Sequence, residues 1–299
     1  MFYKEGSKDY AMVREIQQAL NIKVDGQFGP KTTQAVIRFQ SDNHIVADGV
    51  VGPETLEVMG ILDTDQRTQL IFRTDNGLTV ERRYLPQGEY IVPTAPQNND
   101  YLFIHHTGGW HNPFNVIDDW GRDTRGKIAT EFVIGGQSFK DGTDDYDGRV
   151  VQAFPEGMQG WHLGNTGSYY MNRHSVGIEM CNFGQLNSEF KNYVNVKAHE
   201  SQIVTLKEAF RGYTNWHKYS ERQLYALKKL IYHISSRDDI DIREGVVKWL
   251  HNGGAKKAFS FNQEAYEGKI KGLLFHNNVR KDKVDVFPQT ELIDMLLSL

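Results

Sequence analysis

Three short stretches of the sequence contain residues that could bind a metal ion or move a proton. The first is Ile104-His105-His106-Thr107, where two histidines end an apolar run. In the second, His276 is followed nine residues later by Asp285, with Lys283 two positions before that aspartate. The third, Ser175-Val176-Gly177-Ile178-Glu179, ends in a carboxylate. Imidazole and carboxylate groups are metal ligands and proton carriers, so these stretches are candidates for a metal site with an acid or base beside it.

Each stretch by itself also has a plainer interpretation. A histidine at a strand end is often structural, Arg280 to Asp285 could be a solvated charged loop, and Glu179 could lie at the surface or in a cleft. Side chains alternate across a strand, so His105 and His106 should point to opposite faces and only one can serve a given site. In an extended segment Lys283 and Asp285 share a face, which would place a cation beside the carboxylate.

The elements that must position these residues follow from hydrophobic periodicity. Four apolar runs predict strands, and Leu224, Leu227, Leu230 and Ile231 predict a helix over 221–235. Strands that alternate with helices indicate the α/β class. The predicted strands cover residues 101–105, 132–134, 150–154 and 176–180.

The first sixty residues contain an internal repeat. Asp25-Gly26-Gln27-Phe28-Gly29-Pro30-Lys31-Thr32 recurs twenty-three positions later as Asp48-Gly49-Val50-Val51-Gly52-Pro53-Glu54-Thr55. In each copy Asp-Gly predicts a turn and Gly-Pro predicts the start of a helix, near Lys31 and Glu54. With an earlier helix through Val13, Ile16 and Leu20, three short helices are expected. Residues 63–98 then predict a linker with a hairpin around Asp75-Asn76-Gly77.

Composition excludes several classes of protein. The 299 residues are 39% hydrophobic and 24% charged, which suits a folded protein with a core. The net charge of −4 argues against nonspecific nucleic-acid binding. The single cysteine, Cys181, allows neither an intrachain disulfide nor an all-cysteine zinc site. We expect no membrane span and no secretory signal, because the sequence has no apolar run of the required length.

The repeat resembles a known domain family. Ile16-Gln17-Gln18-Ala19-Leu20, the two Asp-Gly-x-x-Gly turns and Ala35-Val36-Ile37-Arg38-Phe39-Gln40 are similar to the three-helix peptidoglycan-binding domain found beside many cell-wall enzymes. The resemblance covers roughly residues 8 to 61. It implies that this region binds bacterial peptidoglycan.

The three chemical stretches together resemble the zinc-dependent N-acetylmuramoyl-L-alanine amidases, the type shared by T7 lysozyme and the peptidoglycan recognition proteins. The matching motifs are Ile104-His105-His106-Thr107-Gly108-Gly109, Gly160-Trp161-His162-Leu163-Gly164, the strand from Asn172 to Glu179, and His276 with Lys283, Asp285 and Pro288. The resemblance implies a central mixed β-sheet flanked by helices, and a Zn²⁺ ion held by His105, His276 and Asp285.

The resemblance also implies the chemistry. Zinc with two imidazoles and one carboxylate keeps a fourth position for water, whose pKa falls toward ~7. Glu179 takes the place of the general base and Lys283 faces the developing oxyanion. The bond cut would be the amide between N-acetylmuramic acid and L-alanine of the stem peptide. The substrate-binding candidates are Trp161, His162, Glu131, Trp110 and Asn172.

Several alternatives stay open at this stage. His233 and His251 are other candidates for the second histidine ligand, and Glu131 or the two tryptophans could be purely structural. Cys181 lies on the face of Glu179, but no histidine is tied to it by spacing. The chain has Ala129-Thr130-Glu131-Phe132-Val133-Ile134 where some relatives have a tyrosine, so no tyrosine role is carried over. Residues 242–271 are expected to be an insertion.

The overall prediction is a cell-wall hydrolase with domains at 1–62 and 99–299 joined by the 63–98 linker. We expect a monomer that binds peptidoglycan, without nucleic acid or membrane insertion. The lack of a signal peptide predicts an endolysin of a phage or prophage that stays in the cytoplasm until release, with an injected effector as the second possibility. A recognition protein without turnover, or a zinc peptidase that cuts within the stem peptide, are the alternative functions.

Overall fold

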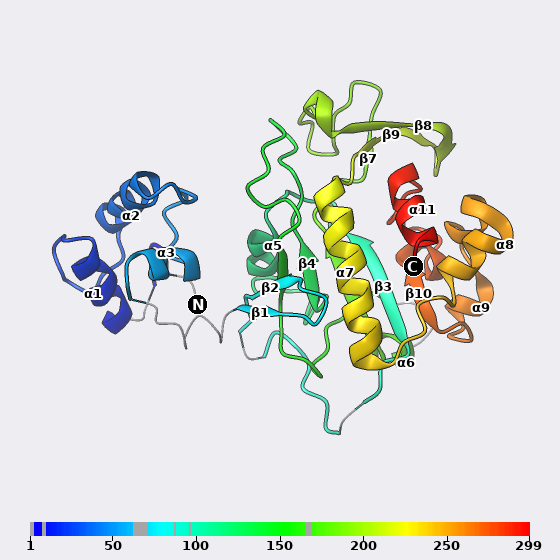
Figure 1. The fold of residues 1–299 in the computed structure, drawn as a ribbon, viewed down its shortest axis with the longest axis horizontal. Helices are drawn as coiled ribbons and strands as arrows, with labels where there is room; N and C mark the ends of the chain where they lie inside the picture. The colour runs from blue at the N-terminus through cyan, green and yellow to red at the C-terminus, as the bar shows by residue number, and fades with distance from the viewer. Residues whose placement is uncertain (1–2, 8–9, 62–70, 87, 96, 165–168) are drawn as a thin grey trace. The chain divides into compact units, whose positions relative to one another are not determined.

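The computed structural model describes residues 3–7, 10–61, 71–86, 88–95, 97–164 and 169–299. The chain divides into two compact units, residues 1–72 and 73–299, each of which is described by itself (Figure 1). Residues 62–70 of the predicted linker, including Leu70 at the start of the hairpin, lie outside the described residues. No helix within the described ranges is long and apolar enough to cross a membrane.

The N-terminal unit contains the three predicted helices. They are α1 (Tyr10–Ala19), α2 (Pro30–Asp42) and α3 (Pro53–Val58), and the last two begin at the prolines of the two Gly-Pro pairs. Proline is favoured at this position because its missing N–H would have no partner in the first turn. The apolar faces of the helices bury a common core with the segments between them: Tyr3, Val13, Ile16, Phe28, Val36, Val51 and Leu56.

A buried glutamine locks each copy of the repeated turn. The Gln17 amide nitrogen donates to Asp25 Oδ1 at 2.9 Å and to Thr32 Oγ1 at 3.2 Å, and its oxygen accepts from Gly26 N at 2.8 Å. Gly26 has a φ of +76°, which suits glycine. Gln40 makes the same contacts in the second copy, to Asp48, Thr55 and Gly49, at 3.1, 3.1 and 2.9 Å. The repeat in sequence is therefore a repeat of one hydrogen-bonded turn.

The second unit is built around a seven-stranded mixed sheet with the order β1-β2-β5-β4-β6-β3-β10. β3 and β6 pair in parallel, as do β10 with β3, β4 with β6, and β2 with β5; β4 and β5 are antiparallel. Every residue of β3 is buried, as expected for a strand covered on both faces. The strands are β1 (Ile71–Arg73), β2 (Thr79–Arg82), β3 (Tyr101–His106), β4 (Phe132–Ile134), β5 (Val150–Gln152), β6 (Ser175–Met180) and β10 (Gly272–Phe275).

Helices flank this sheet, and a small second sheet lies in the chain between β6 and α7. α5 packs on β4 and β5, α7 packs on β4, α8 packs on β10, and α11 contacts both α7 and α8 (Figure 1). The three-stranded sheet has the order β7-β9-β8. These elements are α5 (Pro113–Trp120), α6 (Tyr169–Arg173), β7 (Gln185–Leu186), η1 (Glu200–Gln202), β8 (Ile203–Phe210), β9 (Tyr213–His217), α7 (Glu221–Asp238), α8 (Val246–Ala258), α9 (Gln263–Tyr266), α10 (His276–Val279) and α11 (Thr290–Leu297).

The predicted α/β class, the central mixed sheet and the flanking helices are confirmed. The hairpin around Asn76 differs from the linker role expected for it, because its strand β2 pairs in parallel with β5 and extends the sheet of the second unit. Backbone pairing to a distant strand carries no local sequence signal, which explains the difference. Residues 242–271, expected as an insertion, contain α8 and α9. Their status as an insertion stays a prediction.

Candidate metal centre and active site

Side chains from two distant parts of the sequence meet at one end of the sheet. His105 lies near the end of β3, and His276 directly follows β10, whose residue Phe275 is paired with Ile104. Parallel pairing therefore brings the two histidines to neighbouring positions. His105 Nδ1 lies 3.1 Å from His276 Nδ1 and 3.2 Å from Asp285 Oδ2, and His276 Nδ1 lies 3.0 Å from the same oxygen. All three residues are buried.

The two adjacent histidines of β3 point to opposite faces, as alternation predicts. His105 faces His276 and Asp285, whereas His106 Nδ1 lies 2.8 Å from the hydroxyl of buried Tyr219. His106 is thus part of the hydrogen-bonded core. Of the two, His105 is the residue placed to bind a metal.

The donor atoms fit a zinc ion. Two imidazole nitrogens and one carboxylate oxygen, all within 4.8 Å of one another, form the type of three-ligand set found in catalytic zinc sites, which leaves a position for water. Burial lowers the pKa of His105 to about 4, so the ring stays neutral and can donate a lone pair. Burial alone would raise the pKa of Asp285, but the facing His276 and His105 hold it well below its usual value. The carboxyl group is therefore ionised, as ligation requires.

Glu179 lies next to this cluster on the neighbouring strand. It is the register partner of His105 in the parallel β3–β6 pair, so the two side chains share a face of the sheet. Its Oε2 atom is buried and, within the described part of the chain, has no hydrogen-bond partner. Burial raises the pKa of Glu179 well above its ordinary value; nearby Asp285 raises it further and Lys283 opposes the shift. A carboxyl group with a raised pKa and a free oxygen is suited to exchange protons near neutral pH.

Lys283 is half-buried and lies two residues before Asp285. The ammonium group lies close enough for its charge to lower the pKa values of both His105 and Glu179. A cation there could stabilise negative charge that develops on a carbonyl oxygen.

The predicted tryptophan contacts are partly exposed. Trp110 follows the end of β3, is 38% exposed, and packs edge-on against Phe183 with the Lys140 Nζ 4.9 Å from its ring centre. Trp161 is half-buried and its ring centre lies 5.3 Å from that of Tyr169. Both rings have surface available to a ligand. Their substrate-binding roles stay predictions.

Two other substrate candidates have internal partners. Glu131 is buried and forms a bidentate ion pair with Arg237, at 2.6 and 2.9 Å, and it accepts a hydrogen bond from Gln152 at 2.9 Å. Asn172 is also buried, and its side chain bonds the backbone of Leu163 and Gly164. The structure thus uses both side chains to hold the protein together, and a contact with substrate stays a prediction for each.

His162 connects the ligand candidate His105 to Ser175 on β6. Its Nδ1 is 3.0 Å from His105 Nε2, and its Nε2 is 2.8 Å from Ser175 Oγ. Sequence reasoning listed His162 but missed Ser175. The signal that could have found it is its position on the face of β6 that also carries Glu179.

The other histidine and cysteine candidates lie elsewhere. His233 belongs to α7 and His251 is exposed on α8, and neither is in the metal cluster found among the described residues. Burial, with a contribution from Glu179, raises the pKa of Cys181 well above its usual value. The thiol therefore stays protonated and is a poor nucleophile.

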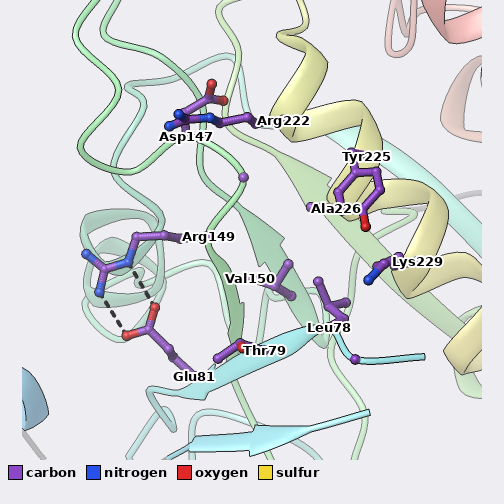
Figure 2. Close-up of a pocket in the computed structure, with 12 residues that line it drawn as sticks. Leu78, Thr79, Glu81, Asp147, Arg149, Val150, Arg222, Tyr225, Ala226 and Lys229 are labelled. Atoms are coloured by element: carbon purple, nitrogen blue, oxygen red, sulfur yellow. Dashed lines mark hydrogen bonds and ion pairs between the residues drawn. The ribbon is translucent and has the colours of Figure 1, made fainter. Parts of the chain in front are cut away.

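A separate pocket of about 380 Å³ lies between β2, residues 147–150 and α7 (Figure 2). Arg149 and Glu81 on its wall pair with each other at 2.8 and 2.9 Å, as the dashed lines in Figure 2 show. Leu78, Val150 and Ala226 supply apolar lining. None of the metal-ligand candidates lines this pocket, so it is distinct from the metal centre.

Each of the two units contains residues that match a known protein family. Residues 95–281 match the N-acetylmuramoyl-L-alanine amidase family, and residues 9–59 match a peptidoglycan binding domain family. The zinc D-Ala-D-Ala carboxypeptidase of Streptomyces albus G is 40% identical over 76 residues, which cover 23% of this chain and 29% of the relative. The chain thus spans less than a third of that curated relative's length.

Solved structures with similar folds include amidases. PlyL is 10% identical with a TM-score of 0.40, over 73% of this chain and 96% of PlyL. The N-acetylmuramoyl-L-alanine amidase LysC from Clostridium intestinale URNW is 16% identical with a TM-score of 0.38, over 73% of this chain and 98% of LysC.

The amidase match covers more than half of the chain. It contains His105, Glu179 and His276, and Asp285 follows shortly after its end. The chain belongs to the N-acetylmuramoyl-L-alanine amidase family.

Proposed function

We propose that this protein hydrolyses the amide bond between N-acetylmuramic acid and L-alanine of the peptidoglycan stem peptide, with zinc as its metal. The observation that carries the proposal is the convergence of His105, His276 and Asp285 within 4.8 Å, beside Glu179, in a chain of the amidase family. His105 stays neutral, Asp285 is ionised, and Glu179 has a buried oxygen without a hydrogen-bond partner among the described residues.

The metal would be held by His105 Nδ1, His276 Nδ1 and an Asp285 oxygen. A zinc ion bound there supplies a Lewis acid that polarises the scissile carbonyl and lowers the pKa of water toward ~7. Glu179 accepts the proton of the attacking water at its unpaired Oε2, and its raised pKa lets it keep that proton and pass it to the leaving amine. Lys283 offsets the negative charge that grows on the carbonyl oxygen as the amide carbon becomes tetrahedral.

The N-terminal unit is proposed to bind the same polymer. Its match to a peptidoglycan binding domain family and its three-helix fold support this role. We further propose a monomer that acts as an endolysin, kept in the cytoplasm until it reaches the cell wall. The pairing of a wall-binding unit with an amidase unit supports this last step.

Mass spectrometry of digested peptidoglycan tests the function. The full chain would be incubated with purified peptidoglycan as isolated, after chelation, and after zinc is restored. We expect stem peptides with a free L-alanine N-terminus, lost on chelation and recovered with zinc. Cleavage within the stem peptide would instead establish a peptidase, and binding without any released peptide would establish a recognition protein.

A further inference from the structure

We propose that the dipeptide His162–Leu163 is the hydrogen-bonded support that orients both histidine ligands of the metal. Asn172 and Ser175 hold this dipeptide in place. These four are positioning residues, because they act on the metal through His105 and His276. The inference rests on the proposed metal site and adds to it the part of the chain on which its geometry depends.

The ring of His105 is held through its second nitrogen. Its Nδ1 faces the other two ligands, so its Nε2 must carry the ring proton when Nδ1 binds a metal. That N–H donates to His162 Nδ1 at 3.0 Å, which requires the proton of His162 to lie on Nε2. His162 Nε2 in turn donates to Ser175 Oγ at 2.8 Å. The Ser175 hydroxyl donates to the backbone oxygen of Asn172 at 3.4 Å. Every donor in this series of three hydrogen bonds therefore has an acceptor.

The second nitrogen of His276 also has a partner in this dipeptide. Its Nδ1 also faces the cluster, and its Nε2 lies 3.4 Å from the backbone oxygen of Leu163. Arg280 donates to that same oxygen at 3.4 Å. The two ligand rings are thus fixed in the same tautomer by adjacent residues, one through a side chain and the other through a carbonyl. A metal-binding histidine commonly needs such a partner on its second nitrogen.

Asn172 holds the dipeptide through its side chain. Its Oδ1 accepts from Leu163 N at 3.1 Å and its Nδ2 donates to Gly164 O at 3.4 Å. Since its backbone oxygen also accepts from Ser175, one buried residue ties together the supports of both ligands. This accounts for a buried asparagine at the end of α6.

Space for the His162 ring comes from a glycine of β6. A Cβ atom at Gly177 would lie 3.1 Å from His162 Nδ1 and 2.6 Å from Thr130 Cγ2. Gly177 stands between Ser175 and Glu179 on the same face of the strand. The strand that carries the proposed base therefore also leaves room for the ring that supports His105.

The test measures zinc affinity of the full chain by competition with a chromophoric chelator. We expect His162→Ala to weaken zinc binding by about 10- to 100-fold, the usual effect of losing such a partner. His162→Asn keeps an acceptor near the position of Nδ1 and should recover part of the loss. Ser175→Ala leaves His162 without its acceptor and should weaken binding less than His162→Ala does.

His174→Ala is the matched control. His174 is a half-buried histidine one residue before Ser175, and its Nδ1 pairs with the backbone oxygen of Asn98 at 2.7 Å, away from the ligands. Its affinity should stay within about twofold of wild type. Absorption spectra of the cobalt-loaded proteins give a second readout, and we expect a changed ligand-field band for His162→Ala only. Unfolding of the metal-free proteins shows whether each variant is folded.

Wild-type affinity and a wild-type cobalt spectrum in folded His162→Ala would overturn the inference. If that variant does not fold, His162→Asn and Ser175→Ala decide the question, and unchanged affinity in both would overturn it. A wild-type chain that fails to bind zinc would instead overturn the metal site of the proposed function. The two failures are therefore distinguishable.

Discussion

The two units of this protein differ in how far apart in the sequence their interacting buried polar side chains lie. In the N-terminal unit, Gln17 finds its partners 8 to 15 residues along the chain, and Gln40 repeats the pattern. In the second unit, His105 meets partners 171 and 180 residues away. The first arrangement depends on a turn and the two helices that flank it, whereas the second depends on the order and register of a seven-stranded sheet.

This difference has a physical consequence. A local turn can be lost with little effect beyond its own unit, because few distant contacts depend on it. A site assembled from separate strands fails when any one strand end moves, and its ligands have no other way to meet. Substitutions in each unit test this contrast.

The largest effect is expected from removing a metal ligand. His276→Ala leaves one imidazole and one carboxylate as ligands. We expect amidase activity to fall by at least about 10³-fold, because the metal would no longer contribute several kcal/mol of transition-state stabilisation. Binding to purified peptidoglycan through the N-terminal unit should stay within about twofold. Activity assays and a pull-down with insoluble peptidoglycan measure the two properties. The contrast would be broken if this variant lost wall binding together with activity.

Glu179→Gln should remove proton transfer while leaving zinc binding intact. The amide keeps the size of the side chain but cannot take a proton from water, so we expect kcat to fall by about 10²- to 10⁴-fold. Zinc affinity should change by no more than a few fold. Glu189→Gln, at an exposed glutamate on the same segment of chain, is the control and should retain activity. Loss of zinc together with activity would show that Glu179 acts through the metal ligands.

The sequence could predict what periodicity and turn chemistry determine. The strands through Tyr101, Phe132, Val150 and Val176 were predicted close to their observed bounds, because apolar runs report buried strands directly. The opposite orientation of His105 and His106 follows from the same alternation. The grouping of the three ligands came from a resemblance of motifs, since no local pattern links His105 to Asp285.

What the sequence could not show is pairing between distant segments. The Glu131–Arg237 ion pair joins residues 106 positions apart, and either residue alone is simply a charged side chain. The same holds for Ser175 beneath His162, and for β2 beside β5. These contacts depend on strand order, and many strand orders are compatible with one set of predicted strands.

Removing either buried glutamine of the N-terminal unit, Gln17 or Gln40, should show the modest cost of losing a local contact. Gln17→Ala or Gln40→Ala leaves the buried N–H of Gly26 or Gly49 without its acceptor, so we expect each to destabilise the N-terminal unit by about 1–3 kcal/mol. Hydrogen exchange of those two glycine amides in the full chain measures the effect locally. Exposed Gln18→Ala is the control. Amidase activity on a soluble muramoyl peptide should not change, and unequal losses from the two glutamines would show that the copies are not equivalent.

The last effect concerns acid stability, and it should be confined to the second unit. His217 is fully buried, its Nδ1 accepts from Phe183 N at 2.9 Å, and burial lowers its pKa from 6.5 to about 3. Below pH 6.5 the unfolded chain binds a proton at this residue that the folded chain does not, so stability falls as pH falls toward 3. At pH 5 the loss from this group is about 2 kcal/mol relative to pH 7.5. His217→Asn can still accept from Phe183 N but does not titrate, so its denaturant midpoint should fall less between these pH values. Equal falls in both proteins would mean that His217 takes up its proton without unfolding, and that acid sensitivity of this unit comes from its other buried histidines.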